Sequence, residues 1–279
     1  MDSPPILAGV IGWPVEHSLS PKIHTAAAAA AGIDLLYTAI PVEVGHVGNA
    51  IARMREVGIR GYSVTMPHKE AVISELDELT TSAHALGAVN HITNTAGHLL
   101  GNNTDGDGFV LGLEHSGDSL VNGSTVGVLG SGGAARAIIE ACYRHGAREV
   151  IVVARSEERG AVAAGLAHER GRLRDLDAFT ECDIVVNATP LGMAETDGEG
   201  VVAFDVGALA ENTTVVDIVY NPRETPLLAA ARERGLPTVE GVTMLVGQAA
   251  EQFTAWTGHE APLAEMFDAV LNELSLIHI

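Results

Sequence analysis

Lysine is rare in this sequence, and one of its two lysines stands where a side chain could do chemistry. Lys69 lies in GYSVTMPHKEAV, residues 61–72, whereas the other lysine is Lys22 and the remaining basic residues are arginine. A lysine that is partly removed from water changes its protonation near neutral pH, which arginine does not. The usual role of a lysine is that of a solvated residue, here at the start of a helix, and the other motifs of the sequence decide whether Lys69 differs.

A glycine-rich stretch predicts a second chemical site. VLGSGGAAR, residues 128–136, follows an apolar strand and opens a helix, and it matches the pattern G-x-G-x-x-A at Gly130, Gly132 and Ala135. Such glycines permit a tight turn and a close approach of the backbone, and the helix N-terminus offers N–H groups to a pyrophosphate. The stretch predicts dinucleotide binding, with a purely structural glycine turn as the alternative.

The end of the next strand indicates which dinucleotide is bound. EVIVVARSEER, residues 149–159, continues from this strand into Ala154, Arg155 and Ser156, with Arg159 one helical turn later. NAD sites usually carry Asp or Glu at this position for the ribose 2′-hydroxyl, whereas arginine suits the 2′-phosphate of NADP. Two guanidinium groups and a hydroxyl therefore predict NADP, and a solvated, charged helix start is the alternative.

Strands that alternate with helices are expected to position these residues. Apolar runs predict strands from Ile6, at 35–42 and at 61–66, and helices at 20–32 and 44–57. The first helix is expected to take Ser20 as its cap, with proline at the first helical position. Two alternating runs that flank residues 95–97 predict a β-hairpin.

A second series of strands and helices begins after a predicted boundary. A helix is expected at 105–115, and the polar stretch 117–124 suits a domain boundary. Strands follow from Thr125, at 183–189 and at 214–219, and helices near 244–256 and 263–274 close the chain. Alternation of this kind predicts right-handed βαβ units and a parallel sheet.

Composition excludes several classes of partner. The formal net charge is -20, which repels phosphate backbones and anionic membranes, so we expect no nucleic-acid or membrane partner. The sequence has no apolar run near the roughly 18 to 20 residues of a membrane span. Two cysteines, Cys142 and Cys182, and an N-terminus without a basic region suggest a reducing cytoplasm. The histidines are scattered, which gives no support for a metal site.

Six segments of the sequence resemble the shikimate dehydrogenase family. They are GWPVEHSLSPKIH, GYSVTMPHK, GAVNHITNTAGHLLGNNTDGDG, NATPLGM, DIVYNPRETPLL and GVTMLVGQAAEQFTAWTG, and they are spread over nearly the whole chain in the family's order. The resemblance implies an α/β protein with an N-terminal α/β substrate domain, whose sheet is mixed but mainly parallel, and a Rossmann-like NADP-binding domain, with a cleft between them. We place the substrate domain at 1–120, completed by C-terminal helices in 242–279, and the NADP domain at 121–241.

The resemblance also implies a catalytic pair and a substrate site. Lys69 and Asp105 match the pair that handles the proton of a secondary alcohol as hydride leaves or reaches the same carbon. Asp105 would orient the ammonium group, and it could equally cap the helix that follows. The substrate-binding positions are Ser18, Ser20, Thr65, Lys69, Asn90, Asp105, Tyr220 and Gln248. Ser18 and Ser20 match the pair that holds the substrate carboxylate, and the neutral side chains suit a polyhydroxylated ring.

The cofactor positions follow from the same resemblance. They are Gly130, Ser131, Gly132, Gly133, Ala134, Ala135, Arg136, Ala154, Arg155, Ser156, Arg159, Thr189, Ile218, Gly241 and Met244. Residues 130–136 match the pyrophosphate loop, and Arg155, Ser156 and Arg159 match the clamp on the adenosine phosphate. The last three positions correspond to the nicotinamide pocket. The chain departs from the family at Ala154, where asparagine is usual.

Three alternatives remain beside this prediction. They are a quinate/shikimate dehydrogenase that uses NAD, a non-catalytic NADP-binding regulatory homologue, and an enzyme that uses Lys69 to form a Schiff base. Ser20, which is threonine in some quinate-preferring members, and the arginines Arg155 and Arg159 favour shikimate and NADP. We therefore expect reversible reduction of 3-dehydroshikimate to shikimate with NADPH, in the pathway to chorismate and aromatic amino acids. The protein is expected to be a cytoplasmic monomer or homodimer without a metal.

Overall fold

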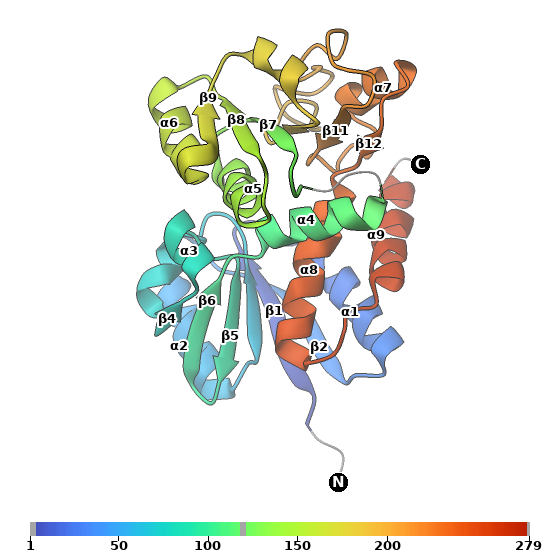
Figure 1. The fold of residues 1–279 in the computed structure, drawn as a ribbon. Coiled ribbons are helices and arrows are strands. Elements are labelled where there is room, and N and C mark those ends of the chain that lie inside the picture. Colours follow the sequence, from blue (N-terminus) through green and yellow to red (C-terminus); the bar gives the residue numbers. More distant parts are fainter. Residues whose placement is uncertain (1–3, 118–120, 278–279) are drawn as a thin grey trace. The chain divides into compact units, whose positions relative to one another are not determined.

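The chain folds into two compact units (Figure 1). The computed structural model describes residues 4–117 and 121–277. Unit 1 comprises Met1–Thr104 and Gln248–Ile279, and unit 2 comprises Asp105–Gly247. The chain therefore passes between the units twice, once after Thr104 and once after Gly247.

Unit 1 contains a six-stranded mixed sheet. Its strands are β1 (Ile6–Gly12), β2 (Leu35–Pro41), β3 (Gly61–Val64), β4 (Glu78–Leu79), β5 (His91–Thr95) and β6 (His98–Asn102). They lie in the order β2-β1-β3-β5-β6-β4. β1 is parallel to β2 and to β3, whereas β5 is antiparallel to β3 and to β6. The antiparallel pair is the predicted hairpin, which is confirmed.

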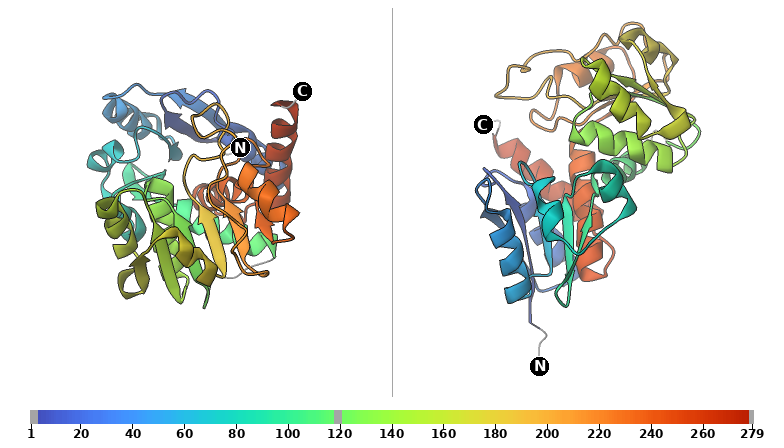
Figure 2. Two further views of the ribbon diagram at one scale, coloured as in Figure 1. Left: turned by 90° about the horizontal axis from the view of Figure 1, so that it is seen from above. Right: turned by 90° about the vertical axis from the view of Figure 1, so that its left-hand side faces the viewer.

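Helices cover both faces of this sheet (Figure 2). They are α1 (Ser20–Ala31), α2 (Val47–Val57), η1 (Ala71–Glu75), α3 (Thr81–Leu86), the later part of α8 (Val242–Thr257) and α9 (Leu263–Ile277). Successive side chains of a strand point to opposite faces. Accordingly, Ile11 packs in the core cluster beneath α2, whereas Val10 packs with Trp256 of α8. β3 follows the same rule, since Tyr62 faces α2 and Ser63 faces α8.

The start of α1 differs from the prediction. Leu19 occupies the N-cap position without a side-chain cap, and Ser20 is the first residue of the helix. The side chain of Ser18 instead accepts the N–H of Ser20 over 3.3 Å. The prediction of Ser20 as the cap was therefore wrong, because the preceding serine lies at the turn into the helix. The predicted end was right: Gly32 follows the helix with φ +66, a conformation that favours glycine.

Unit 2 contains a parallel six-stranded sheet. Its strands are β7 (Thr125–Leu129), β8 (Glu149–Val153), β9 (Gly171–Leu173), β10 (Ile184–Asn187), β11 (Thr214–Asp217) and β12 (Thr238–Val239). They lie in the order β12-β11-β10-β7-β8-β9, and each neighbouring pair is parallel. The strands read as apolar runs because both faces are buried. In β8, for example, Val150 and Val152 join one core cluster and Ile151 joins the other.

The helices of unit 2 lie on the two faces of this sheet (Figure 2). They are α4 (Asp105–Ser116), α5 (Gly133–Arg144), α6 (Glu157–Gly165), η2 (His168–Arg170), η3 (Leu176–Glu181), α7 (Pro226–Glu233) and the beginning of α8. Residues of α4, α5 and α6 join one core cluster, and residues of η3 and α7 join the other. Connections through such helices form the βαβ units that the sequence pattern predicts.

The helix α4 belongs to unit 2, although the predicted domain boundary lies beyond it, at 120. A Cβ added at Gly106 would lie 2.5 Å from the carbonyl oxygen of Ala137 in α5. A Cβ added at Gly247 would likewise lie 2.2 Å from the carbonyl oxygen of Gly108. Glycines thus allow α4 to pack closely against α5 and against the beginning of α8. The division of roles between a substrate domain and a cofactor domain stays a prediction.

Candidate active site

The predicted substrate residues of unit 1 gather at one edge of its sheet. β1 and β3 are parallel, so their carboxyl ends meet at the same edge. Ser18 and Ser20 follow β1, whereas Thr65 and Lys69 follow β3. Asn90 directly precedes β5, whose antiparallel pairing with β3 places the start of β5 at this edge as well.

Main-chain hydrogen bonds join the segments at this edge. The N–H of Val64 donates to the carbonyl of Asn90 over 2.8 Å, and the N–H of Val89 donates to the carbonyl of Lys69 over 2.7 Å. Thr65 is the next residue after Val64. The structure therefore brings Thr65, Lys69 and Asn90 together, as the substrate-site prediction requires.

Buried polar side chains connect Asn90 with Gln248. The Oδ1 atom of Asn90 accepts hydrogen bonds from the N–H of Thr104 at 2.8 Å and from its hydroxyl at 3.3 Å. The Nε2 atom of Gln252 donates to that hydroxyl at 3.2 Å and to the Oε1 atom of Gln248 at 2.8 Å. Gln252 is a residue that the sequence reasoning missed. Its spacing of four from Gln248 places both side chains on one face of α8 and is the signal that could have found it.

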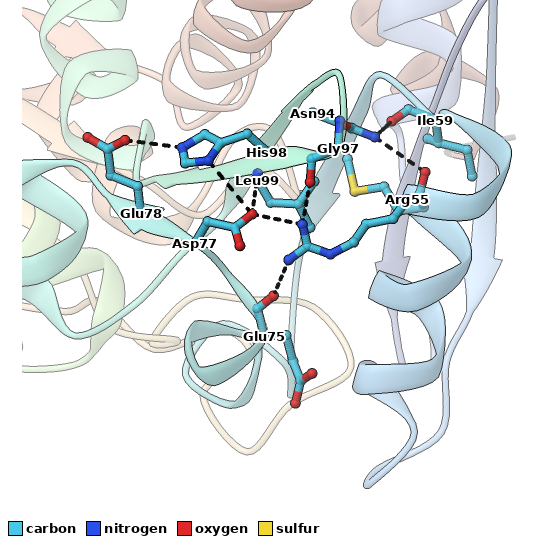
Figure 3. A network of polar contacts seen from close by, with 10 residues as sticks. Arg55, Ile59, Glu75, Asp77, Glu78, Asn94, Gly97, His98 and Leu99 are labelled. Atoms are coloured by element: carbon cyan, nitrogen blue, oxygen red, sulfur yellow. Dashed lines mark hydrogen bonds and ion pairs between the residues drawn. The ribbon is translucent and has the colours of Figure 1, made fainter.

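A second network holds the opposite end of the β5–β6 hairpin (Figure 3). The Oδ2 atom of Asp77 accepts hydrogen bonds from Arg55 of α2 and from the N–H of Leu99 in β6, both at 2.7 Å. The hydrogen bond from Arg55 is the main cause that lowers the pKa of Asp77. The side chain of Asn94 accepts the N–H of Gly97 in the turn at 2.8 Å. These bonds fix the turn end of the hairpin to α2 and to the segment around Asp77.

The loop with the two serines rests on an aromatic layer. Burial raises the pKa of Tyr37 in β2, and the side chains of Ser63 and Ser20 partly offset this rise. His24, one turn further along α1, stacks on Tyr37 with ring centroids 4.3 Å apart. Burial lowers the pKa of His24 to about 3, so the ring is neutral at physiological pH. Neither ring nitrogen of His24 has a hydrogen-bond partner among the residues that the structure describes.

The predicted cofactor residues gather at one edge of the unit 2 sheet. The segments that carry them come directly after the carboxyl ends of parallel strands: Gly130 after β7, Ala154 after β8, Thr189 after β10, Ile218 after β11 and Gly241 after β12. From β7 the strands follow in the order β7, β8, β9 towards one edge of the sheet, and from β10 in the order β10, β11, β12 towards the other. The strand order thus reverses between β7 and β10, and ligands of such sheets bind outside the carboxyl ends of the strands at this point.

The glycine loop leaves room where a pyrophosphate would lie. Gly130 has φ +124, and a Cβ added there would lie 2.8 Å from the carbonyl oxygen of Ala188, so a larger residue does not fit. A Cβ added at Gly132 or Gly133, in contrast, would meet nothing within 4 Å. Gly132 is the N-cap of α5 and makes no side-chain cap bond. The open space and the helix N-terminus fit the predicted pyrophosphate.

The clamp predicted for the adenosine phosphate carries two exposed arginines. Ser156 caps α6, and its Oγ atom accepts the N–H of Arg159 at 3.3 Å. Within residues 4–117 and 121–277, no hydrogen bond or ion pair involves the guanidinium group of Arg155 or Arg159, whereas eleven other arginines have such an interaction. In a chain with 36 acidic residues, two unpaired guanidinium groups fit a phosphate dianion.

A buried network orders the loops after β10 and β11. The hydroxyl of Thr189 donates to the Oδ1 atom of Asn187 at 2.6 Å, and the Nδ2 atom of Asn187 donates to Asp217 at 2.9 Å. The other carboxylate oxygen of Asp217 accepts the hydroxyl of Thr225 at 2.7 Å. Asp217 is fully buried, and this burial raises its pKa to about 6. Asn187 and Asp217 were not predicted, and each occupies the last position of its strand.

The predicted nicotinamide-pocket residues also lie close to one another. A Cβ added at Gly241 would lie 2.5 Å from the carbonyl oxygen of Ile218. Ile218 and Met244 both pack against the core cluster on the α5 face of the sheet. Tyr220 is half-buried, and burial raises its pKa. The structure therefore brings Ile218, Gly241 and Met244 together.

Comparison with known proteins decides the family. The shikimate dehydrogenase substrate binding domain matches residues 10–92, and the shikimate 5′-dehydrogenase C-terminal domain matches residues 241–271. The shikimate dehydrogenase (NADP(+)) of Symbiobacterium thermophilum is 42% identical to this chain, and the match covers 96% of this chain and 94% of that one. The chain belongs to the shikimate dehydrogenase family. The same enzyme of Moorella thermoacetica is also 42% identical, over 96% of this chain and 92% of its own.

Residues 125–220 match a further family, NADP oxidoreductase coenzyme F420-dependent. The matched residues span the glycine loop and the end of β8, as well as the segments that follow β10 and β11. The match covers much of the unit for which the sequence predicts NADP.

Solved structures related to shikimate dehydrogenase share this fold. One shikimate dehydrogenase in complex with NADP+ has a TM-score of 0.90 at 33% identity, covering 97% of this chain and 96% of that one. The shikimate 5-dehydrogenase of Thermus thermophilus, in complex with NADP(H) and shikimate, has a TM-score of 0.88 at 31% identity, and the match covers 96% of this chain and 99% of that one. The quinate dehydrogenase of Corynebacterium glutamicum, in complex with NAD, has 0.87 at 32%, covering 96% and 99%. The predicted family and α/β fold class are confirmed.

The catalytic pair expected of a shikimate dehydrogenase is divided between the units. Lys69 is half-buried in unit 1, and Asp105 is the first residue of α4 and of unit 2. Because α4 begins at Asp105, this residue lies in the first turn, where the helix dipole favours a negative charge. It does not precede the helix as a cap, as one prediction had it. The roles of both residues in proton transfer stay a prediction.

Two further properties of the chain concern membranes and metals. None of the described helices is long and apolar enough to cross a membrane. In the described part of the chain, no three His, Cys, Asp or Glu side chains are grouped so as to hold a metal ion.

Proposed function

We propose that this protein reversibly reduces 3-dehydroshikimate to shikimate with NADPH, in the pathway that leads to chorismate and the aromatic amino acids. The observation that carries the proposal is the pair of sheet edges. At one edge, Lys69 lies close to Asn90, whose side chain is connected with Gln248 through neutral groups. At the other edge, two arginines that have no hydrogen-bond or ion-pair partner for their guanidinium groups among the described residues follow the strand next to the open glycine loop. The family and the names of its relatives support the same reaction.

Unit 1 is proposed to bind the substrate. Ser18 and Ser20, beside the N-terminus of α1, suit the substrate carboxylate, and Tyr220 would approach the same group. Thr65, Asn90 and Gln248 offer donors and acceptors to the ring hydroxyls. Such neutral groups suit a polyhydroxylated ring, because each hydroxyl both donates and accepts a hydrogen bond.

Lys69 is proposed to exchange the proton of the reacting oxygen. When the substrate alcohol is oxidised, its hydroxyl proton must leave as the carbon loses hydride, and the reverse holds for reduction of the ketone. An ammonium group donates a proton to the developing alkoxide and an amine accepts one from the alcohol. Asp105 would orient the lysine and accept a hydrogen bond from a neighbouring hydroxyl.

Unit 2 is proposed to bind NADP, which supplies or accepts the hydride when it is bound. The N–H groups at the start of α5 would hold the pyrophosphate, and residues 131–136 would line it. Arg155, Ser156 and Arg159 would hold the 2′-phosphate. Ala154, immediately after β8, carries no carboxylate, so it cannot accept a hydrogen bond from the ribose 2′-hydroxyl of NAD as Asp or Glu does in NAD sites. Thr189 would contact the cofactor, and Ile218, Gly241 and Met244 would border the nicotinamide.

A crossed absorbance assay tests the proposal. Reduction of NADP+ and of NAD+ is followed with shikimate and with quinate, at several salt concentrations because the chain carries a net charge of -20. The expected result is that shikimate with NADP+ gives the highest kcat/KM. Absence of turnover with all four pairs would leave the non-catalytic homologue as the better explanation. A preference for quinate and NAD+ would favour the second candidate, which the similarity to the Corynebacterium glutamicum enzyme supports.

The remaining predictions concern the state of the protein in the cell. We propose a cytoplasmic protein that is a monomer or a homodimer, without nucleic-acid or membrane partners. Light scattering coupled to gel filtration would measure its mass in solution. A mass above that of two chains would contradict the predicted oligomeric state.

A further inference from the structure

A continuous chain of hydrogen bonds runs through the core of unit 1 beneath the proposed substrate site. It starts at Tyr37 of β2, whose hydroxyl donates to the Oγ atom of Ser63 at 2.7 Å. Ser63 donates to the Oε1 atom of Gln252 at 2.5 Å, and Gln252 then donates to the Oε1 atom of Gln248 at 2.8 Å. The chain thus reaches a residue that we assign to the substrate.

The order of donors along this chain fixes the orientation of both amides. Ser63 accepts from Tyr37 and gives its one hydroxyl proton to Gln252. The amino group of Gln252 faces the main-chain carbonyl of Asn90, which can only accept, so the atom that faces Ser63 is the carbonyl oxygen. The amino group of Gln252 consequently points to Gln248 and to Thr104. The oxygen of the Gln248 amide is turned towards Gln252, and its amino group lies on the other side.

Gln252 is too deeply buried for a direct contact with substrate to be its main role. Only 1% of the residue is exposed, and its amino group has three acceptors within 3.5 Å for two protons. Trp256 and Phe253, its neighbours on α8, are apolar and buried, so packing alone would accept leucine at position 252. A satisfied polar chain in such a core specifies one arrangement of its members.

We propose that Ser63 and Gln252 are positioning residues that hold the Gln248 amide with its amino group towards the substrate, so that Gln248 acts as a hydrogen-bond donor to a substrate oxygen. This inference rests on the proposed function, because it assigns the geometry of one of its substrate contacts. The chain joins β2, β3 and α8, and it therefore sets the position of Gln248 relative to the sheet of unit 1.

Steady-state kinetics of four variants test the proposal. Gln252→Leu keeps the size of the side chain and removes its bonds, and we expect KM for shikimate to rise at least about tenfold. Ser63→Ala leaves the bond between Gln252 and Gln248, so we expect a smaller rise, about threefold. The variant Gln248→Ala and the double variant with Gln252→Leu complete a cycle. Because Gln252 acts through Gln248, the double variant should match Gln248→Ala alone.

Asn94→Ala provides the matched control for lost stability. Asn94 is a buried amide in the same sheet, with three hydrogen bonds to main-chain groups, and it lies at the opposite end of β5. Its removal should lower the urea midpoint about as much as Gln252→Leu does and leave KM for shikimate unchanged. KM for NADP+ should stay within about twofold in all of these variants, because the chain lies in unit 1.

The outcomes separate this inference from the proposed function. Wild-type protein that turns over no shikimate would refute the proposed function. Active wild type together with an unchanged KM in Gln252→Leu would refute this inference alone. Effects of Gln248→Ala and Gln252→Leu that simply add, or a rise of KM in Asn94→Ala equal to that in Gln252→Leu, would also overturn it. If Gln252→Leu does not fold, the smaller effect of Ser63→Ala and its cycle with Gln248→Ala decide.

Discussion

The two units order their site loops with buried polar networks of different chemistry. In unit 1 the network consists of hydroxyls and amides, namely Tyr37, Ser63, Gln252 and Gln248. In unit 2 the network centres on the carboxylate of Asp217, which accepts hydrogen bonds from Asn187 at the end of β10 and from Thr225 at the start of α7. Neutral networks are insensitive to pH, whereas a buried carboxylate couples the order of its loops to protonation.

The aromatic layer beside the unit 1 network strengthens this contrast. Burial lowers the pKa of His24 and of His91 to about 3, and burial raises the pKa of Tyr37. None of these groups changes charge between pH 5 and pH 8. The pKa of Asp217, about 6, lies inside that range. We therefore expect the positioning of the substrate in unit 1 to be insensitive to pH, and the order of the loops in unit 2 to depend on pH.

The largest expected effect is on turnover and comes from unit 1. Lys69→Ala should lower kcat about a thousandfold, because it removes the proposed proton-transfer group, and should leave the Kd of NADP+ unchanged. Stopped-flow and steady-state kinetics measure this. Lys22→Ala is the control, since that lysine is exposed and pairs with Glu273. Equal kcat values for the two variants would return Lys69 to the role of a solvated surface residue.

The next effect is on stability and comes from the carboxylate in unit 2. Since burial raises the pKa of Asp217 from 3.8 to about 6, the folded state holds the proton more tightly than the unfolded chain. The resulting stabilisation is complete below pH 4 and is lost as the pH rises to 6, by about 3 kcal/mol. Asp217→Asn does not titrate. Urea unfolding should therefore show the variant gaining stability relative to wild type between pH 4 and pH 7, and a constant difference would contradict this.

Cofactor choice should change by a similar amount when the clamp is removed. The double variant Arg155→Ala with Arg159→Ala should weaken NADP+ binding about a hundredfold, because two charge-assisted contacts to a phosphate are lost. Binding of NAD+, which lacks that phosphate, should change by less than about threefold. Calorimetric titration measures both. Arg174→Ala, which removes an exposed arginine paired with Glu181, should bind NADP+ like wild type.

The smallest expected effect completes the comparison between the networks. Gln252→Leu should destabilise the protein, but its difference from wild type should vary by less than about 0.5 kcal/mol between pH 5 and pH 8, because the groups around it stay neutral. The same urea titrations that test Asp217→Asn provide the measurement. A dependence on pH as large as that of Asp217→Asn would show that both networks are coupled to a titrating group.

The elements that carry the site residues could be predicted because their signals are local. The apolar strand before Gly130, the alternating runs around residues 95–97 and the glycine after α1 each act within a few residues, through backbone conformation and periodicity. The positions of Arg155 and Arg159 after β8 are local in the same sense. That these two arginines have no acidic partner among the described residues could not be predicted in this way, because it depends on where the acidic side chains, 36 in the whole chain, lie in space.

Contacts between distant segments could not be predicted. Ser63 and Gln252 are 189 residues apart and meet only because β3 lies beneath α8. α4 was expected with the first domain because the polar stretch 117–124 after it suits a domain boundary, but its glycines pack it on α5 in unit 2. Serine is a residue type that often caps helices, which is why Ser20 was predicted as the cap. In the structure Ser20 is the first residue of α1, and its N–H donates to Ser18 in the preceding turn.

The sequence by itself therefore determined the strands and helices, the glycine loop, the candidate lysine and the resemblance to the family, because each depends on neighbouring residues or on a linear pattern. Only the tertiary structure decided which polar side chains form hydrogen bonds in the core and which arginines have no partner for their guanidinium group among the described residues. It also decided that Asp217 is buried far enough to hold a proton near pH 6. The physical reason is that desolvation and hydrogen bonding depend on the neighbours that folding brings into contact.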